Sequence, residues 1–137
     1  MKKYEMFATT ADVGIRFCGR NFAELYENAV AGLNGLLFGE AKGTPADSGA
    51  RRFSFHGDSA ENVLVNLLAE VLSLVYQKNK RVTAVVCRRA DESSLDADLR
   101  LARIDGEPGL DIKAVTYHKL QVVEKNGVKR ASIFFDV

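Results

Sequence analysis

The stretch that decides the fold is residues 59–75, which read SAENVLVNLLAEVLSLV. Its apolar residues recur at steps of three and four, which places them on one face of an α-helix. Ser59, or a residue beside it, is suited to begin the helix. This is the more apolar of two predicted helices, so we expect it to lie deepest in the core. The predicted buried face consists of Val63, Leu64, Leu67, Leu68, Val71, Leu72 and Val75.

A second helix is predicted ahead of this one, with an apolar stripe that runs from Phe22 to Leu37. Asn21 can cap its N-terminus, and Glu24 follows three residues later in a capping-box arrangement. Gly32 and Gly35 weaken the end of the helix, and Gly39 is expected to terminate it.

The rest of the chain is predicted to form strands, because β-branched and aromatic residues alternate with polar ones. Asn126-Gly127 between two such runs is a strong signal for a hairpin. Residues 40–50 show no periodicity and are interpreted as an exposed, mobile loop. The prediction is an α+β fold, with a mixed, mostly antiparallel sheet, two core helices and a C-terminal hairpin. The expected strands are residues 13–18, 52–56, 81–88, 95–104, 112–124 and 128–137.

Composition limits the function classes. The chain has 137 residues, 47% of them hydrophobic, which predicts a single domain over residues 1–137. Net charge is +1 and the basic residues are scattered in small groups, so RNA is expected to be contacted only indirectly. Cys18 and Cys87 are interpreted as free thiols. Residues 1–7 lack an apolar signal core and no stretch is long enough to span a bilayer, which favours a cytoplasmic protein without membrane contact.

No motif of a self-sufficient enzyme is present: the sequence has no Gly-rich phosphate loop, G-x-S-x-G elbow or H-E-x-x-H pair. Two segments do carry carboxylates in unusual places. Asp12 stands at the start of a predicted strand, whereas Asp136 and the main-chain carboxylate of Val137 follow an apolar final strand. If the two strands are neighbours, these oxygen donors converge, and such a set favours Ca²⁺, with Mg²⁺ possible. The alternative is that Asp12 merely forms a turn and the acidic end is incidental.

Three segments resemble the archease family. The family is marked by a D-H-T-A-D-x-G-I block, an I-K-A-V-T-Y-H segment and an ending in D-V or D-I. The corresponding stretches here are residues 8–15 (ATTADVGI), 112–118 (IKAVTYH) and 134–137 (FFDV). Ala8 and Thr9 replace the Asp and His of the first block. The second helix keeps Glu70 but lacks the tryptophan and asparagine of the family's W-L-N-E-L-L, which could mark a divergent member.

The resemblance implies an accessory factor for the tRNA-splicing RNA ligase that joins 3′-phosphate and 5′-hydroxyl ends. Such a factor is not itself an enzyme; it promotes guanylylation of the ligase and multiple turnover. The resemblance also implies Ca²⁺ binding through Asp12, Asp136 and Val137. Lys113, His118 and Glu70 are candidates for contact with the ligase or its nucleotide. For Lys113 the alternative is a lysine that merely lies at a sheet edge.

Two other function classes stay open at this point. A small metal-dependent hydrolase could use a carboxylate-bound Mg²⁺ to activate water, with His118 as the base. An RNA-binding or chaperone-like modulator is the third possibility. Activity of the chain alone, compared with activity only when ligase is added, separates the first two classes.

Overall fold

Two helices lie at the centre of the computed structural model, which describes residues 2–9, 12–39 and 47–137. The second, α2 (Ala60–Lys78), buries the whole apolar face that the sequence predicts, and Leu67 is completely shielded from solvent. Ser59 caps this helix, because its hydroxyl accepts a hydrogen bond from the N–H of Asn62 at 3.1 Å. The predicted stripe and cap are both confirmed.

The first helix, α1 (Phe22–Phe38), has the predicted caps. The Asn21 side chain accepts from the N–H of Glu24 at 2.8 Å. The Glu24 carboxylate accepts from the N–H of Arg20 at 3.2 Å, one residue before the Asn21 N–H that a capping box predicts. The helix ends at Gly39, which adopts a positive φ of 68°. Gly32 and Gly35 prove to be packing positions, since a Cβ atom on either would lie within 3.4 Å of Tyr4.

The strands form two antiparallel sheets. Sheet A has the order β1-β2-β8-β6, with β7 paired to β8, and sheet B has the order β3-β5-β4. Every strand pair in the described parts of the chain is antiparallel, and the α+β prediction is confirmed. The strands of sheet A are β1 (Tyr4–Ala8), β2 (Val13–Gly19), β6 (Ala114–Val115), β7 (Val123–Lys125) and β8 (Val128–Asp136). Those of sheet B are β3 (Asp47–His56), β4 (Lys80–Ala90) and β5 (Ser94–Arg103).

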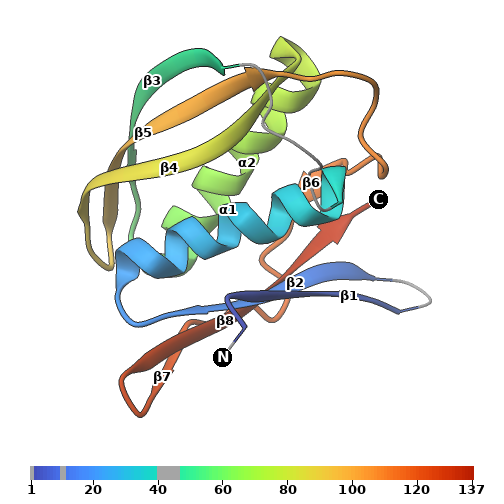
Figure 1. Ribbon diagram of the computed structural model, residues 1–137. Helices are drawn as coiled ribbons and strands as arrows, with labels where there is room; N and C mark the ends of the chain where they lie inside the picture. The colour runs from blue at the N-terminus through green and yellow to red at the C-terminus, as the bar shows by residue number, and fades with distance from the viewer. Residues whose placement is uncertain (1, 10–11, 40–46) are drawn as a thin grey trace.

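The helices separate the two sheets. α1 contacts β2 and β8 of sheet A on one side and β4 of sheet B on the other, and Figure 1 shows it running between them. α2 packs against α1, all three strands of sheet B, and β6. The core is therefore formed by the helices together with the inner face of each sheet, such as Ile15 and Ile133 of sheet A and Leu99 of sheet B. Neither described helix combines the length and apolar character that a membrane crossing requires.

Three parts of the strand prediction were wrong. The residues after 46 belong to β3, which begins at Asp47, because the backbone of residues 47–50 pairs with β5; residues 40–46 of the expected loop lie outside the described residues. β1 was not predicted. The expected strand over residues 112–124 is broken, since Lys119 has a φ of 53° and the N–H of Leu120 donates to the carbonyl of Tyr117 at 3.0 Å. Only β6 and β7 remain from it.

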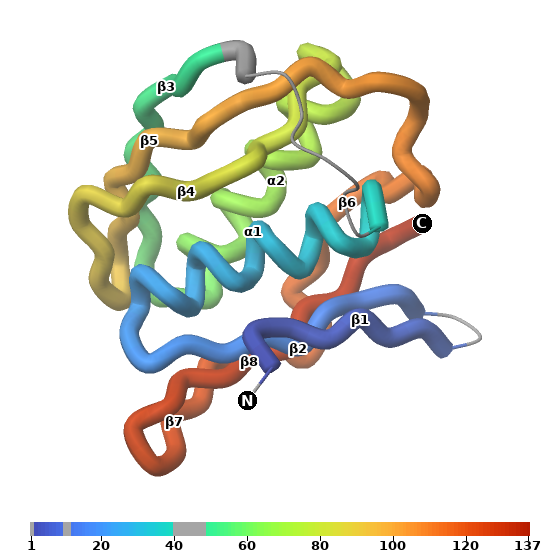
Figure 2. The backbone as a smooth tube through the Cα atoms, in the orientation of Figure 1, coloured from blue at the N-terminus to red at the C-terminus, as the bar shows by residue number. Residues whose placement is uncertain are grey.

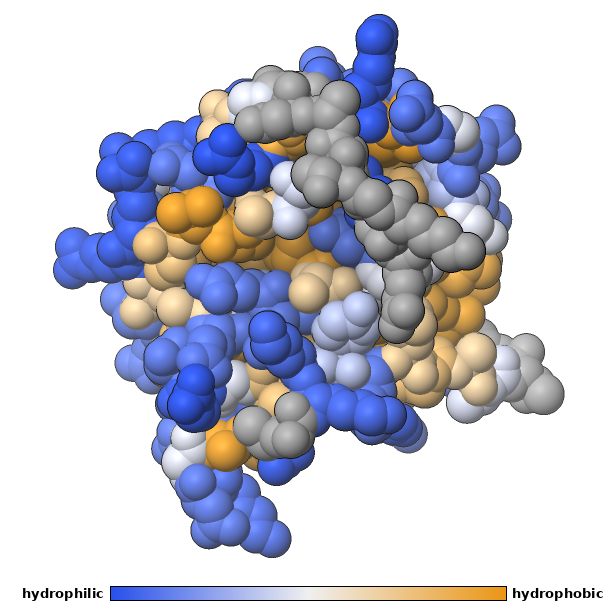
Figure 3. All heavy atoms as spheres, viewed as in Figure 1, coloured by the Kyte–Doolittle hydropathy of each residue, from blue (hydrophilic) through white to orange (hydrophobic). Residues whose placement is uncertain are grey.

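The hairpin at Asn126-Gly127 is confirmed. Asn126 has a φ of 55° and Gly127 a φ of 75°, and a two-residue type I′ turn requires positive φ at both positions. The turn joins β7 to β8 and projects as a polar knob at the lower left of the space-filling view (Figure 3).

One buried hydroxyl ties α1 to the turn between β4 and β5. Tyr26 is fully buried, and its hydroxyl donates to the carbonyl oxygen of Asp91 at 2.6 Å. Burial, reinforced by the negative charge of Asp91, raises the pKa of Tyr26. The phenol therefore stays protonated and keeps its role as a donor.

Because Leu67 has no exposure at all, Leu67→Ala should lower the free energy of unfolding by about 2–5 kcal/mol through the cavity that it leaves. Val86→Ala is the matched control, since Val86 lies on β4 and is 46% exposed; it should cost less than about 1 kcal/mol. Urea titration of both variants is the measurement. Equal losses would contradict the assignment of α2 to the centre of the core.

Candidate functional site

The ends of β2 and β8 bring Asp12 and Asp136 together. Val13 pairs with Phe135, so the next residue on each strand, Asp12 and Asp136, lies at the same end of sheet A. The C-terminus, the end of β1 and the start of β2 lie on the same side of the molecule in Figures 1 and 2. The expected proximity of these two residues is therefore present in the fold.

Two hydrogen bonds join Thr9 to Asp12, the residue that precedes β2. The N–H of Thr9 donates to the carbonyl of Asp12 at 2.7 Å, and the N–H of Asp12 donates to the Thr9 hydroxyl at 3.0 Å. Thr9, at the position of the family's histidine, thus braces the turn. Neither carboxylate of the pair Asp12 and Asp136 forms a hydrogen bond or ion pair within the described parts of the chain, so both remain available to a ligand.

Residues 113–116 hold the end of β8 in place. The N–H of Lys113 donates to the carbonyl of Asp136 at 2.8 Å. Both the N–H and the hydroxyl of Thr116 donate to the carbonyl of Phe134, each at 3.0 Å. The side chain of Lys113 is exposed to solvent, and Val137 is 51% exposed. This segment fixes the backbone at the acidic end of β8, and it carries an exposed lysine.

Two tyrosines anchor the same segment to α2. The Tyr117 hydroxyl accepts a hydrogen bond from the Asn62 side chain at 2.6 Å. The Tyr76 hydroxyl accepts from the N–H of Ile112 and donates to the carbonyl of Leu110, both at 3.0 Å. The residues on either side of Lys113 are thereby attached to the central helix.

A row of aromatic rings borders the acidic pair on the outer face of sheet A. Phe7, Gly14 and Phe134 stand opposite one another on β1, β2 and β8. The Phe7 ring lies so close to Gly14 that a Cβ atom there would collide with it and with the carbonyl oxygen of Ile133. Phe7 meets Phe134 edge to face at 5.1 Å between centroids, and His118 meets Phe134 in the same way at 5.2 Å. The absence of a side chain at Gly14 thus leaves room for the Phe7 ring over β2.

The structure places four of the predicted site residues at one end of sheet A. This end holds Asp12, Lys113, Asp136 and Val137. The ring of His118 contacts Phe134 of β8, two residues before Asp136. Glu70 lies on α2, four residues after Asn66, whose side chain donates to the carbonyl of His56 at the end of β3. Glu70 forms no hydrogen bond or ion pair with the other candidates in the part of the chain that the structure describes.

The donor set fits a hard cation only in part. No group of three or more His, Cys, Asp or Glu side chains able to hold a metal occurs among the described residues. Asp12 and Asp136 supply two carboxylates, and further oxygen donors would have to join them. Ca²⁺ prefers six to eight oxygen ligands, so water or a partner would complete such a site.

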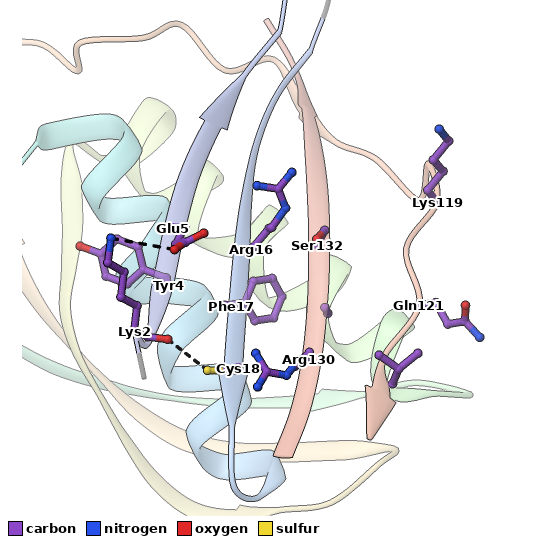
Figure 4. Close-up of a pocket in the computed structure, with 12 residues that line it drawn as sticks. Lys2, Tyr4, Glu5, Arg16, Phe17, Cys18, Lys119, Gln121, Arg130 and Ser132 are labelled. Atoms are coloured by element: carbon purple, nitrogen blue, oxygen red, sulfur yellow. Dashed lines mark hydrogen bonds and ion pairs between the residues drawn. The ribbon is translucent and has the colours of Figure 1, made fainter. Parts of the chain in front are cut away.

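Residues that sequence reasoning missed lie along the same outer face. Lys2, Arg16, Lys119 and Arg130 line an open groove of about 590 Å³. They come from four separate segments, which the pairing of β1, β2 and β8 and the path of the segment after His118 bring together, so no local sequence signal could have found them. Figure 4 shows Arg16 and Arg130 on the central strands, with Lys2 to one side and Lys119 to the other.

The comparison with known families decides the relationship. The model of the archease protein family matches residues 4–137. The chain belongs to the archease family. Among its relatives, the protein archease of Thermoplasma volcanium is 30% identical over 98% of each chain. That of Sulfurisphaera tokodaii is 27% identical over the full length of both.

Two solved structures share the archease fold. The solution structure of protein 1598 from Methanobacterium thermoautotrophicum superposes with a TM-score of 0.75, at 23% identity over all of both chains. The crystal structure of an archease from Thermotoga maritima, described there as a possible chaperone, gives a TM-score of 0.68 at 19% identity, covering 97% of this chain and 96% of that one. At these identities the likeness concerns the fold.

Proposed function

We propose that this archease-family chain is an accessory factor that activates a tRNA-splicing RNA ligase by promoting its guanylylation, so that each ligase molecule turns over repeatedly. The observation that carries the proposal is the proximity of Asp12 and Asp136 at one end of sheet A. The two residues belong to two segments that resemble the archease family, residues 8–15 and 134–137, and the pairing of β2 and β8 makes these segments neighbours. The description of a Thermotoga maritima relative as a possible chaperone supports a role on another protein.

In this proposal Asp12, Asp136 and the main-chain carboxylate of Val137 hold a Ca²⁺ ion, with Mg²⁺ as the alternative. When bound, the ion supplies positive charge able to attract phosphate or carboxylate groups of the partner. The chain's own contribution is to position the two carboxylates. The turn at Thr9 fixes the backbone of Asp12, and the N–H of Lys113 fixes that of Asp136.

Lys113 and His118 extend the proposed contact surface. Lys113 is exposed beside the acidic end, and the exposed His118 ring packs on Phe134. Lys113 is suited to contact phosphate oxygens of the ligase's nucleotide, because an ammonium group offers three donors. His118 is suited to contact the ligase surface.

Lys113→Ala should reduce ligase activation about tenfold and change the melting temperature by less than about 2 °C, because its side chain is exposed and only its main chain bonds to β8. Lys125→Ala, at the tip of the β7–β8 hairpin, is the control and should retain activation. A thermal melt and a ligation assay are run on each variant. If Lys113→Ala melts many degrees lower and loses activity in proportion, Lys113 has a structural role.

The proposal as a whole is tested by a ligation time course with limiting cognate ligase, in the presence and absence of this chain. We expect product to stop near one equivalent of ligase without the chain and to continue over many turnovers with it. The chain alone should form no product. Identical time courses would exclude the activator role, and cleavage or ligation by the chain alone would support an enzyme instead.

A further inference from the structure

The groove on the outer face of sheet A has a floor and two walls. Arg16 of β2 and Ser132 and Arg130 of β8 lie in the floor, while Lys2 and Lys119 belong to opposite walls (Figure 4). Its volume of about 590 Å³ is within the range of ligand-binding clefts. The groove is therefore large enough to hold a nucleotide-sized group and is open to the surface.

Its charge is strongly one-sided. Four of the lining residues are cations, namely Lys2, Arg16, Lys119 and Arg130. Among the described residues that line the groove, the only acid is Glu5, whose carboxylate lies 3.9 Å from the ammonium group of Lys2. Arg16 is paired with Ser132 of β8, and Arg130 lies two residues before Ser132 on the same strand. Two residues along a strand span about 7 Å, which is comparable to the separation of successive phosphates in an extended polynucleotide. The groove is thus matched to a chain of phosphates.

The groove continues directly into the aromatic row. The Arg16 guanidinium lies over the Phe7 ring, with its central carbon 4.4 Å from the ring centroid. Phe7, Phe134 and His118 follow in edge-to-face contact, and Phe7 and Phe134 are both half-buried, so part of each ring reaches solvent. Guanidinium planes and aromatic rings are the surfaces on which unpaired bases stack.

We propose that the outer face of sheet A binds single-stranded nucleic acid, with phosphates in the groove of Lys2, Arg16, Lys119 and Arg130 and bases against the row of Phe7, Phe134 and His118. This goes beyond the proposed ligase activation and does not depend on it. An acidic peptide could pair with the cations but would leave the aromatic row without a partner. The row favours a ligand that carries a flat ring for each negative charge, as a polynucleotide does. In the sequence the basic residues are scattered, which predicted only indirect contact with RNA. In the folded chain four of them line one groove.

The first experiment measures binding of a fluorescein-labelled, mixed-sequence 12-nucleotide RNA by fluorescence anisotropy from 50 to 200 mM NaCl. With three to four phosphates neutralised, log K against log salt should have a slope of about −2 to −3. A DNA 12-mer should bind within about threefold of the RNA, because phosphates and base faces are common to both. A 12-mer of abasic sites should bind at least fivefold more weakly, because it offers no bases to stack.

Variants then locate the site. Arg16→Gln should weaken binding about five- to tenfold and reduce the magnitude of the salt slope by about 0.7, the value for one phosphate contact. Lys119→Gln, on the other wall, should have a similar effect. Arg51→Gln is the matched control: Arg51 is also exposed and also lies over a ring, Phe53 at 4.9 Å, but belongs to sheet B. It should bind within twofold of the unchanged protein.

Several outcomes would overturn the proposal. They are the absence of RNA binding at 50 mM NaCl, equal losses with Arg16→Gln and Arg51→Gln, and equal binding of the abasic strand. Competition by polyglutamate as effective as that of unlabelled RNA would instead identify the groove as a site for acidic peptides. Thermal melts of Arg16→Gln and Lys119→Gln show whether both variants are folded. Lys119 lies outside the strands, so Lys119→Gln still tests the groove if Arg16→Gln is unstable.

Discussion

Asp136→Asn should abolish stabilisation by Ca²⁺ and reduce ligase activation at least tenfold, and Asp12→Asn should do the same. A ligand at 100 times its dissociation constant adds about 2.7 kcal/mol to the stability of the protein that binds it. The unchanged protein should therefore melt several degrees higher with saturating Ca²⁺, whereas neither variant should respond. Without Ca²⁺ neither variant should melt lower, because each removes one of two neighbouring negative charges.

Asp105→Asn is the control for this pair, since Asp105 is exposed in the segment after β5. It should keep both the Ca²⁺ response and the activation. In a third protein, a peptide tag joined to Val137 converts the main-chain carboxylate of that residue into an amide. This protein should also lose Ca²⁺ affinity, whereas a protein with the same tag at its N-terminus should keep it. A full Ca²⁺ response in Asp136→Asn would exclude a metal site here.

Gly14→Ala is expected to have the largest effect on the outer face of sheet A. The added Cβ atom would collide with the Phe7 ring and with the carbonyl oxygen of Ile133, and the second group belongs to the backbone and cannot rotate away. We expect a loss of about 1–3 kcal/mol in the free energy of unfolding, and more if β2 and β8 separate. Because Asp12 is two residues away, Ca²⁺ binding should weaken as well.

Gly109→Ala is the matched control, because a Cβ atom there would meet only the carbonyl oxygen of Leu37 at an ordinary 3.6 Å. Its stability should change by less than about 1 kcal/mol. Urea unfolding of both variants, with near-ultraviolet circular dichroism as a readout of the aromatic row, is the measurement. Equal stability of the two variants would contradict the close contact of Phe7 with Gly14.

The sequence predicted the parts of the fold that depend on local spacing. Both helices follow from apolar steps of three and four, their caps from Asn21 and Ser59, and the hairpin from Asn126-Gly127. β1 was not predicted because it is stabilised by residues distant in the sequence: Tyr4 packs against Gly32 and Gly35 of α1. The prediction of one strand over residues 112–124 failed because a turn from Tyr117 to Leu120, with a positive φ at Lys119, interrupts the segment.

The candidate site was predictable only where single residues were unusual. Asp12 and Asp136 drew attention as carboxylates beside strands, and the pairing of Val13 with Phe135 makes them neighbours. Phe7, Arg16 and Lys119 carried no such signal, because their proximity depends on strand register and on the path of the segment after His118. Residues from distant segments become a site only when the tertiary structure assembles them.

The central claim is that the chain promotes guanylylation of an RNA ligase, and the most direct measurement is covalent transfer of labelled guanylate from GTP to the cognate ligase. With one molecule of this chain for every ten of ligase, we predict that the initial rate rises at least tenfold and that nearly all of the ligase becomes labelled. The same experiment with Asp136→Asn should give the rate of ligase alone. An unchanged rate with the unaltered chain would contradict the account.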